Sequence, residues 1–507
     1  MAIDTKNGTR GKTTETKSAY EPPVRQTGSL GERLARVKTT RWIRFGIVTA
    51  IFVGWVAWLG SWWVLVFWFL LADIYLTQYI NWGWWKYSRN ATLRTIMGWV
   101  DAIVYALILV YFLFAFVGQN YQIPSSSLEK SLLVGDYLWV NKVTYGPRVP
   151  NTPLHFPLSQ NTLPILNCKS YIEWPQWEYH RLKGLRSIER YDIVVFNFPS
   201  GDTVALKVQN PDYYTLCATE PGGRRTIHNN PQIYGEVIYR PVDRREAYVK
   251  RAVGLPGETL KIVDNTVYID GKPLPEPENV QYNYLIQTDG SSLTAADWER
   301  IGVSVDDRLT VPVNSNIDRL SVLALGLTVK EDGTVPPIYQ APLTKAMVET
   351  TGRMSKISKV IHVPTNEYIN PYPISRDYGW TRADYGEIWI PKKGESIELT
   401  MDNLALYERP IRNYEGNTLE VRDGQILING QVATSYTFKM DYYWMMGDNR
   451  DNSADSRYWG FVPEDHVIGT PVFILVSFDK DRFFPGIRWE RVFRSAVSDK
   501  DLLDAGR

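Results

Sequence analysis

The sequence is poor in the residues that build disulfide frameworks and metal sites. It has 2 cysteines and 5 histidines in 507 residues. The cysteines, Cys168 and Cys217, can form one bridge at most, and either a bridge or two separate thiols fits the sequence. None of the histidines stands in a metal-ligand spacing such as HExxH. We therefore predict no metal and no cofactor.

An excess of charge of one sign is also lacking. The formal net charge is +1, with 22% charged residues, which gives no electrostatic reason to expect a nucleic-acid partner. Hydrophobic residues make up 44% of the chain, which argues against a largely disordered protein. Aromatic residues are plentiful instead, with 19 Trp and 31 Tyr, many of them around apolar runs. Such rings favour the membrane–water interface.

Two apolar runs follow a polar tail at 1–41. The first covers 42–80 and is longer than the roughly 20 residues that one span needs. Gly60-Ser61 offers a break, so we predict a hairpin of two short spans, although Asp73 would be costly in lipid. A single tilted helix that ends near Leu71 is the alternative. The second run, 96–117, predicts a further span.

Basic residues predict the orientation of these spans. One cluster precedes the first span and another occupies the loop at 81–95; they consist of Arg33, Arg36, Lys38, Arg41 and Arg44, and of Lys86, Arg89 and Arg94. The positive-inside rule places both clusters in the cytoplasm. An odd number of spans then places everything after Val117 outside the cytoplasm.

Residues 118–507 contain no further span and are mainly β in pattern. Runs such as Asp192–Phe198 and Ala247–Val253 are rich in β-branched and aromatic residues. Residues 285–385 are more polar, with a short helical pattern at 341–360, and we interpret them as an inserted subdomain. The predicted fold is mainly β: N-terminal spanning helices, a β-rich domain at 118–284 and 386–507, and the insert between its two parts.

A short internal similarity lies within this β-rich part. TLKIVDNTVYIDGK at Thr259–Lys272 matches TLEVRDGQILINGQ at Thr418–Gln431. A duplicated hairpin and chance similarity both remain open, since two copies do not make a repeat array.

Three segments carry residues suited to catalysis: Gln119–Lys142, Glu246–Ile262 and Tyr443–Gly469. The first has three consecutive serines, 125–127, which on their own are typical of a linker or a helix cap. The second places Lys250 within an apolar strand. Burial disfavours an ammonium ion, so such a lysine can be a neutral general base for a serine hydroxyl.

The third segment contains the polar run GDNRDNSADSR. One interpretation is a calcium loop, because its side chains offer oxygen ligands, but the EF-hand spacing and terminal Glu are missing. The other is a hydrogen-bond network in which Ser453 orients the Lys250 amine and Asp455 pairs with Arg457.

These three segments, in this order and after membrane spans, resemble bacterial type I signal peptidases, in the longer form found in Bacteroides-like bacteria. The resemblance implies a serine endopeptidase with a Ser-Lys dyad that removes signal peptides after small residues, at sites of the Ala-x-Ala type, through an acyl-enzyme. It also implies a multi-pass protein of the inner membrane with a periplasmic catalytic domain. The implied partners are signal peptides of secreted preproteins, substrates of the secretion translocon, and membrane lipid.

The resemblance also implies residue roles. Ser127 would be the nucleophile and Lys250 the base, while Ser125 and the Ser127 N–H would form the oxyanion hole. Ser453, Asp455 and Arg457 would support the lysine. The residues implied to line shallow substrate pockets are Ile123, Pro124, Leu128, Leu132, Tyr248 and Val249. The sequence departs from the family pattern at Leu128 and Lys130, where Met and Pro are usual.

Other functions remain to be weighed against this one. Self-cleaving stress-response repressors also use Ser-Lys pairs, but they need a DNA-binding module where this chain has apolar runs. An inactive membrane-anchored binding protein on the same scaffold, or a calcium-dependent β-domain, would also fit parts of the sequence.

Overall fold

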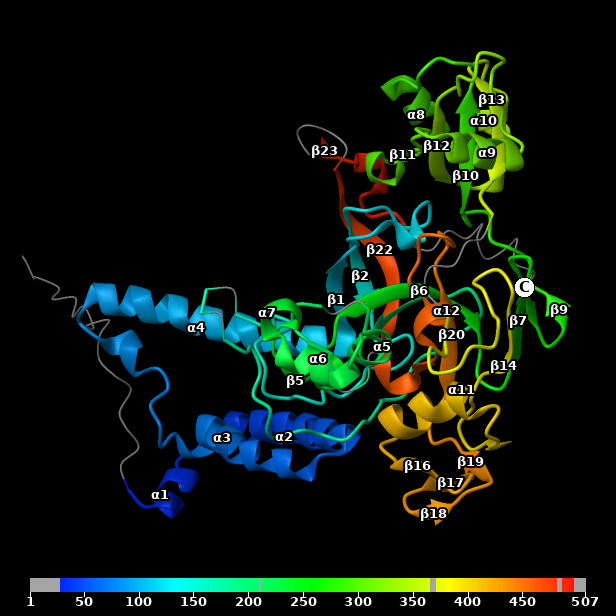
Figure 1. Ribbon diagram of the computed structural model, residues 1–507. Helices are drawn as coiled ribbons and strands as arrows, with labels where there is room; N and C mark the ends of the chain where they lie inside the picture. Colours follow the sequence, from blue (N-terminus) through cyan, green and yellow to red (C-terminus); the bar gives the residue numbers. More distant parts are fainter. Residues whose placement is uncertain are drawn as a thin grey trace, which may run out of the picture. The chain divides into compact units, whose positions relative to one another are not determined.

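The computed structural model divides the chain into two compact units, residues up to Tyr111 and residues from Phe112 onward. It describes residues 28–163, 165–166, 168–199, 201, 203–208, 211–364, 371–480 and 486–496. Figure 1 shows the helices and strands of both units.

The N-terminal unit is helical, and its longest helix ends at the predicted break. Helix α1 (Leu30–Ala35) carries a capping box, and α2 (Thr39–Leu59) ends at Gly60 with φ of 74°, a left-handed conformation that suits glycine. Short helical pieces follow: η1 (Trp62–Phe67), α3 (Trp68–Ala72) and η2 (Asp73–Thr77). Together they form an apolar segment shorter than α2.

Asp73, the residue that made the hairpin costly, has its carboxylate satisfied locally. It accepts hydrogen bonds from the Thr77 hydroxyl at 2.5 Å, the Tyr79 backbone N–H at 2.6 Å and the Trp82 indole at 3.2 Å. The carboxylate thereby caps the end of the apolar segment, where backbone N–H groups would otherwise lack partners.

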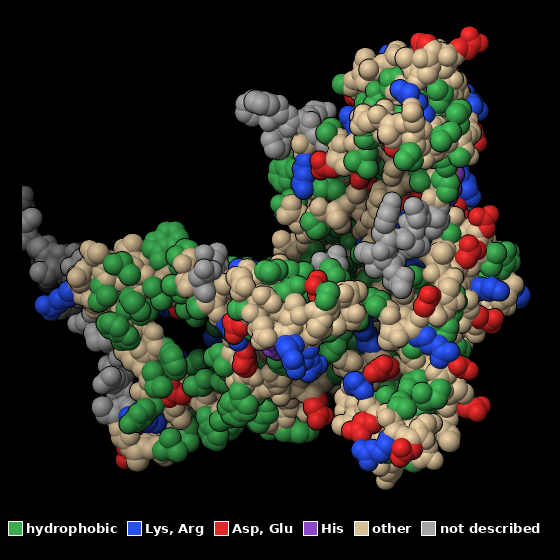
Figure 2. All heavy atoms as spheres, in the orientation of Figure 1, with side chains coloured by type: hydrophobic (Ala, Val, Ile, Leu, Met, Phe, Trp, Pro, Cys, Tyr) green, Lys and Arg blue, Asp and Glu red, His purple; other side chains and the backbone are tan. Residues whose placement is uncertain are grey.

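The helix after η3 (Trp84–Tyr87) is long and apolar. Helix α4 (Ala91–Phe112) continues through η4 (Leu113–Val117), and together they cover 27 residues. Its surface carries exposed large hydrophobic side chains, among them Ile96, Trp99, Val100, Ile103, Val104, Tyr105, Ile108 and Leu109 (Figure 2). By length and composition, Thr39–Leu59 and Ala91–Val117 are the two described helices able to cross a membrane.

The unit from Phe112 onward is β-rich, as predicted. Its largest sheet has the order β1-β2-β22-β3-β6-β20-β21, with β23 beside β22, and all its pairs are antiparallel (Figure 1). These strands are β1 (Gly118–Gln122), β2 (Asp136–Asn141), β3 (Ile193–Asn197), β6 (Ala247–Gly254), β20 (Tyr442–Met446), β21 (Val462–Pro463), β22 (Val467–Asp479) and β23 (Gly486–Ile487).

Strand alternation gives this sheet two apolar faces. Val194, Phe196 and Ala252 contribute to one buried cluster, whereas Ile193 and Val195 contribute to another. Because both faces of β3 are covered, all five of its residues are buried. The neighbouring strand β6 is buried from Lys250 to its end at Gly254.

Four strands that come between β6 and β20 in the sequence form a separate sheet, with the order β11-β12-β10-β13. Its strands are β10 (Tyr282–Thr288), β11 (Leu309–Thr310), β12 (Ile338–Leu343) and β13 (Ile357–His362), accompanied by α8 (Ala295–Ile301), α9 (Asn316–Ala324) and α10 (Lys345–Gly352). This 282–362 region has its own buried cluster, which includes Ile286, Trp298 and Leu343.

Residues 371–385, which the sequence analysis assigned to the insert, pack with the main part of the unit. Tyr372 and Tyr385 belong to the buried cluster that also holds Trp444 and Phe461 of the main part. Strand β14 (Tyr385–Trp389) pairs with β7 rather than with the 282–362 sheet. Aromatic residues of 371–385 therefore pack into the main core, although their polar sequence surroundings suggested otherwise.

The internal sequence similarity corresponds to two matching β-meanders. The first consists of β7 (Thr259–Val263), β8 (Thr266–Ile269) and β9 (Lys272–Pro273), and the second of β16 (Leu419–Arg422), β17 (Gln425–Ile428) and β18 (Gln431–Val432). Leu260 pairs with Ile269, as Leu419 pairs with Ile428. The same side-chain cap recurs, because Asp270 and Asn429 each accept a backbone N–H at 2.9 Å. Both segments therefore form the hairpin that the sequence indicated, with the same register and the same cap.

The remaining elements connect these sheets. They are β4 (Thr203–Ala205), β5 (Val237–Tyr239), α5 (Tyr213–Thr219), α6 (Gly223–Asn229), α7 (Pro231–Tyr234), β15 (Ser396–Glu398), α11 (Leu404–Arg409), β19 (Ser435–Thr437) and α12 (Ser456–Trp459), with short turns η5 (Ser126–Leu128), η6 (Val242–Arg244), η7 (Val305–Asp307), η8 (Pro410–Tyr414), η9 (Glu464–His466) and η10 (Trp489–Arg491). Cys168 and Cys217 are both free thiols.

Candidate active site

Ser127 lies in the short turn η5 that follows β1 and Pro124. Its side chain is 7% exposed, in contrast to Ser125, which is exposed. The backbone carbonyl of Ser127 accepts a hydrogen bond from the Asn449 N–H at 3.1 Å. This hydrogen bond fixes the turn against the polar loop 447–455. Of the three consecutive serines, only Ser127 is buried.

Lys250 approaches Ser127 from strand β6. Its Nζ donates to Ser127 Oγ at 2.7 Å, and the lysine is 4% exposed. Burial lowers the pKa of Lys250 from the usual 10.5 to about 8, although the carboxylates of Asp455 and Asp448 oppose this shift. A lysine of this pKa exists in part as the neutral amine near neutral pH, which is the form that can accept a proton.

Buried ion pairs surround the lysine in the polar loop. Asp455 binds the guanidinium of Arg457 through two oxygens, each at 2.9 Å, as predicted. Asp448 binds Arg251 in the same bidentate manner, at 2.8 Å, and also accepts from the Ser131 hydroxyl. Both carboxylates have lowered pKa values despite burial, because each faces an arginine.

This pairing argues against the calcium alternative. Asp448 and Asp455 are bound to separate arginines, and Asp451 contacts Arg382 at 3.4 Å and the Asn283 N–H at 2.7 Å. The carboxylates therefore do not converge on one point, which a cation site needs. Among the described residues, no group of three or more His, Cys, Asp or Glu is arranged to hold a metal.

Ser453 does not form the hydrogen bond that we expected. Its Oγ is buried and has no hydrogen-bond partner among the described residues. It nonetheless lies beside Ser127: a Cβ added to Gly447 would stand 2.3 Å from Ser453 Oγ and 2.6 Å from the Ser127 carbonyl. Gly447 is thus required by close approach, and Ser453 is next to the dyad without contacting the amine.

The residues expected to line substrate pockets separate into two groups. Ile123, Leu128 and Leu132 are buried in the apolar cluster against which Val249 packs. Tyr248 points to the other face of β6, where its ring stacks on Phe198 and lies 5.8 Å from Lys250 Nζ. Pro124 is exposed.

One contact near Ser127 was missed by the sequence analysis. The Ser126 hydroxyl donates to Asp307 of the 282–362 region at 2.9 Å, and Lys130 Nζ donates to the Gly302 carbonyl of the same region. Lys130 has a φ of 75°, a conformation in which proline cannot exist, since its ring fixes φ near −65°. The departure from the usual Pro thus accompanies a different local backbone. No local sequence signal marks Asp307 as a partner 181 residues away.

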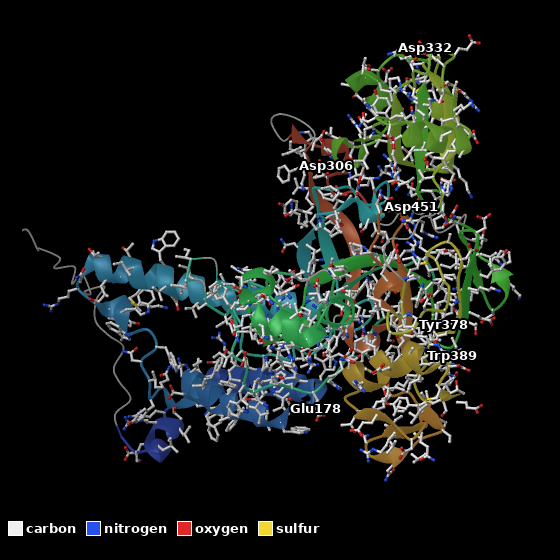
Figure 3. The ribbon with its side chains drawn as sticks, in the orientation of Figure 1. Glu178, Asp306, Asp332, Tyr378, Trp389 and Asp451 are labelled. Carbon is white, nitrogen blue, oxygen red and sulfur yellow. The ribbon has the colours of Figure 1, made fainter. Side chains whose placement is uncertain are left out.

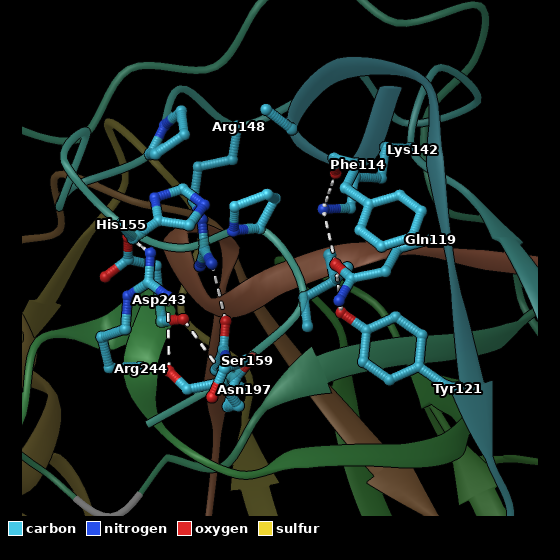
Figure 4. A pocket seen from close by; sticks show the side chains of 15 residues that line it. Phe114, Gln119, Tyr121, Lys142, Arg148, His155, Ser159, Asn197, Asp243 and Arg244 are labelled. Atoms are coloured by element: carbon cyan, nitrogen blue, oxygen red, sulfur yellow. Dashed lines mark hydrogen bonds and ion pairs between the residues drawn. The ribbon is translucent and has the colours of Figure 1, made fainter. Parts of the chain in front are cut away.

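A cavity of about 70 Å³ lies away from the Ser127–Lys250 pair and is lined by residues of η4 and of the loops after β2 (Figure 4). Its cations are already engaged: Lys142 with the Phe114 carbonyl, Arg148 with Asn197 at 2.7 Å, and Arg244 with the Thr152 hydroxyl at 2.6 Å. Ser127 and Lys250 are not among its lining residues. This cavity therefore belongs to the framework between β1 and the loops.

A buried serine hydroxyl bonded to a buried lysine amine is a known variant of the Ser-His-Asp arrangement, which defines a class of serine hydrolases. Comparison with known families agrees with that class. The model of the family "Signal peptidase, peptidase S26" matches residues 96–315 and 394–476, together more than half of the chain. The chain belongs to this family and is a serine peptidase.

Curated relatives carry the same description. Signal peptidase I of Buchnera aphidicola subsp. Baizongia pistaciae is 22% identical over 397 residues, which cover 76% of this chain and 79% of that protein. Signal peptidase I of Buchnera aphidicola subsp. Schizaphis graminum is 24% identical over 386 residues, covering 76% and 77%. Signal peptidase I of Helicobacter pylori is 28% identical over 159 residues, covering 26% and 54%. Family membership supports the cleavage of signal peptides.

Proposed function

We propose that this protein is a membrane-bound signal peptidase I that uses Ser127 as nucleophile and Lys250 as general base. The observation that carries this proposal is the 2.7 Å hydrogen bond between two buried side chains that are 123 residues apart in the chain. Burial of both groups, and a lysine pKa of about 8, suit a base that must be neutral to work.

The reaction proceeds in two stages. Neutral Lys250 takes the proton of Ser127 as Oγ attacks the scissile carbonyl, and the resulting ammonium gives that proton to the leaving amine. The Ser127 N–H and the Ser125 hydroxyl hold the oxyanion. A water molecule, deprotonated by Lys250, then hydrolyses the acyl-enzyme and frees Ser127.

Small residues at the cleavage site fit the apolar surroundings of Ser127. Ile123, Leu128 and Val249 belong to or pack on one cluster beside the nucleophile, and Pro124 and Tyr248 adjoin it in sequence. Small side chains need little room beside the nucleophile, where Ile123 and Leu128 are already buried in the core. This supports a preference for Ala-x-Ala sites.

The apolar helices support attachment to the inner membrane. Helix α4 and η4 lead directly into β1, and Ser127 follows the last residue of β1, Gln122, by a few residues. A chain this short keeps the nucleophile near the membrane surface, because an extended residue spans only about 3.3 Å. Signal peptides expose their cleavage site just beyond their apolar core. The 282–362 region is proposed to be a subdomain inserted into the catalytic domain.

The test is cleavage of a purified preprotein with an Ala-x-Ala site, with the new N-terminus read by mass spectrometry. We expect the detergent-solubilised wild type to cut after the second Ala, and Ser127→Ala and Lys250→Ala each to lose activity by roughly a thousandfold or more. Lys261→Ala, which removes an exposed strand lysine, is the matched control and should cleave normally.

Retained cleavage in either dyad variant would refute the assigned roles. A folded wild type that leaves the preprotein intact would favour the inactive-scaffold alternative. Circular dichroism of each variant distinguishes lost chemistry from lost fold.

A further inference from the structure

We propose that the cleft between the first β-meander and the 282–362 region is a binding site for a peptide carboxylate, with Arg450 as its anchor. The cleft has a volume of about 380 Å³. It is formed by the turn between β7 and β8, the segment Leu274–Pro277, strands β10 and β13, and Arg450 from the polar loop. Neither Ser127 nor Lys250 lines it.

Arg450 is a buried cation that forms no ion pair with the described residues; its charge acts on Asp448, but that carboxylate is bound by Arg251. Arg450 is 5% exposed and lines the cleft. Its Nε has no hydrogen-bond partner, and its guanidinium forms no ion pair among the residues that the structure describes. A buried charge that is left unpaired is costly, so the guanidinium requires a ligand that the cleft can admit.

The neighbouring arginines show what such a guanidinium binds in this protein. Arg251 and Arg457, both within the same network, each hold a carboxylate through paired hydrogen bonds of 2.8 to 2.9 Å. The planar fork of arginine matches a carboxylate in this way. Arg450 presents the same fork to the cleft, and a carboxylate from outside the described residues would complete the pattern.

Two acids line the cleft, Asp264 and Glu276, and neither forms an ion pair with Arg450 among the described residues. Glu276 accepts from the Tyr282 hydroxyl at 2.6 Å and pairs with Lys345 at 2.9 Å, and it forms no ion pair with Arg450. Glu276 and Lys345 therefore compensate each other at the rim.

The walls fit a peptide. Tyr282 and Tyr284 hold the His362 ring edge to face, at 5.6 and 5.3 Å between centroids. Leu274, Pro275 and Pro277 also line the cleft. Aromatic and apolar walls around one charged anchor are typical of ligand sites of a few hundred Å³. The choice of a peptide, rather than another carboxylate, rests on the proposed function, since a peptidase meets polypeptides.

Titration calorimetry on the full-length protein in detergent tests the inference. The probes are three peptides: acetyl-Ala-Tyr-Glu-Ala-amide, its Gln counterpart, and acetyl-Ala-Tyr-Ala with a free C-terminal carboxylate. We expect at least about tenfold tighter binding of one carboxylate peptide than of the Gln peptide, as one charge-assisted pair provides. The Glu peptide identifies an acidic side chain as the ligand, and the free acid identifies a chain terminus.

Variants assign the effect to Arg450. Arg450→Gln should bind all three peptides equally weakly, and Arg450→Lys should restore part of the preference. Lys272→Gln removes one exposed cation from the same meander and should keep the wild-type preference. Equal binding of charged and neutral peptides by the wild type would overturn the inference, and so would a preference that survives in a folded Arg450→Gln.

The proposed function and the proposed carboxylate site can be rejected independently of each other. Loss of preprotein cleavage with intact carboxylate binding would reject the proposed function and leave the site. Normal cleavage without any carboxylate preference would reject the site and leave the proposed function.

Discussion

At the scale of single residues, the protonation state of Lys250 decides whether Ser127 can be activated. Burial lowers the lysine pKa to about 8, whereas an exposed lysine would stay charged up to 10.5. The active form is the neutral one, so activity is lost as pH falls below the pKa and gained as pH rises through it. We expect kcat/KM to rise about tenfold per pH unit below pH 8 and to level above it.

A second pH measurement tests the effect of Asp455, which opposes the lowering of the Lys250 pKa by burial. Its negative charge raises the lysine pKa, so Asp455→Asn should move the midpoint to lower pH. Initial rates on a signal-peptide substrate across the pH range give both profiles. A wild-type profile that is flat from about pH 6 to about pH 9 would exclude Lys250 as the titrating base.

The pair of Asp455 and Arg457 belongs to the residue scale as well. Both side chains are at most 2% exposed, and Asp455 also accepts the Gly447 N–H at 3.1 Å. Arg457→Met would leave a buried carboxylate without its cation, and we expect the free energy of unfolding to fall by about 3–5 kcal/mol. Urea unfolding followed by tryptophan fluorescence measures the change. A loss below about 1 kcal/mol would show that the pair contributes little.

At the scale of elements, the 282–362 region contacts the turn that carries the nucleophile. Asp307 accepts from the Ser126 hydroxyl through one oxygen and from the Ser304 hydroxyl through the other, both at 2.9 Å. Asp307→Ala frees η5 on that side. Because attack needs a fixed Oγ, kcat should fall roughly tenfold with little change in KM.

Two comparisons make this prediction specific. Asp306→Ala changes the exposed neighbour of Asp307 on the same turn and should leave kcat unchanged (Figure 3). In a Ser126→Ala background, Asp307→Ala should add little, since the shared hydrogen bond is already gone. An equal loss in both backgrounds would mean that Asp307 acts by another route.

The 282–362 region also shows which site contacts could not be predicted from the sequence. Ser127, Lys250, Asp455 and Arg457 could be proposed from the sequence because each lies in a short motif whose resemblance to the family could be recognised. Asp307 lies in an ordinary turn, and only the folded chain brings it to Ser126. Likewise, the partners of Asp448 and Asp451 depend on strand register, which composition does not encode. The position of Ser453 without a bond to Lys250 was not foreseen for the same reason.

At the scale of the whole molecule, the sequence predicted N-terminal apolar helices followed by a β-rich part. The predicted break at Gly60-Ser61 coincides with the end of α2. The sequence did not show that the apolar helical segment Trp62–Thr77 would be shorter than α2. Apolar composition does not reveal where the helical geometry changes. The orientation of the chain depends on this segment. If it does not cross, the loop with Lys86 lies outside and the catalytic domain inside.

The two free thiols allow a direct test of that orientation. Cys168 is exposed, so the Cys217→Ser variant carries one natural reporter on the unit from Phe112 onward. The positive-inside rule predicts that a membrane-impermeant maleimide labels Cys168 in intact bacterial spheroplasts. The Lys86→Cys variant, made in a chain in which Cys168 and Cys217 are replaced by Ser, should be labelled only after lysis. The reverse pattern would place basic loops outside and the catalytic domain in the cytoplasm, where exported preproteins could not present a translocated cleavage site.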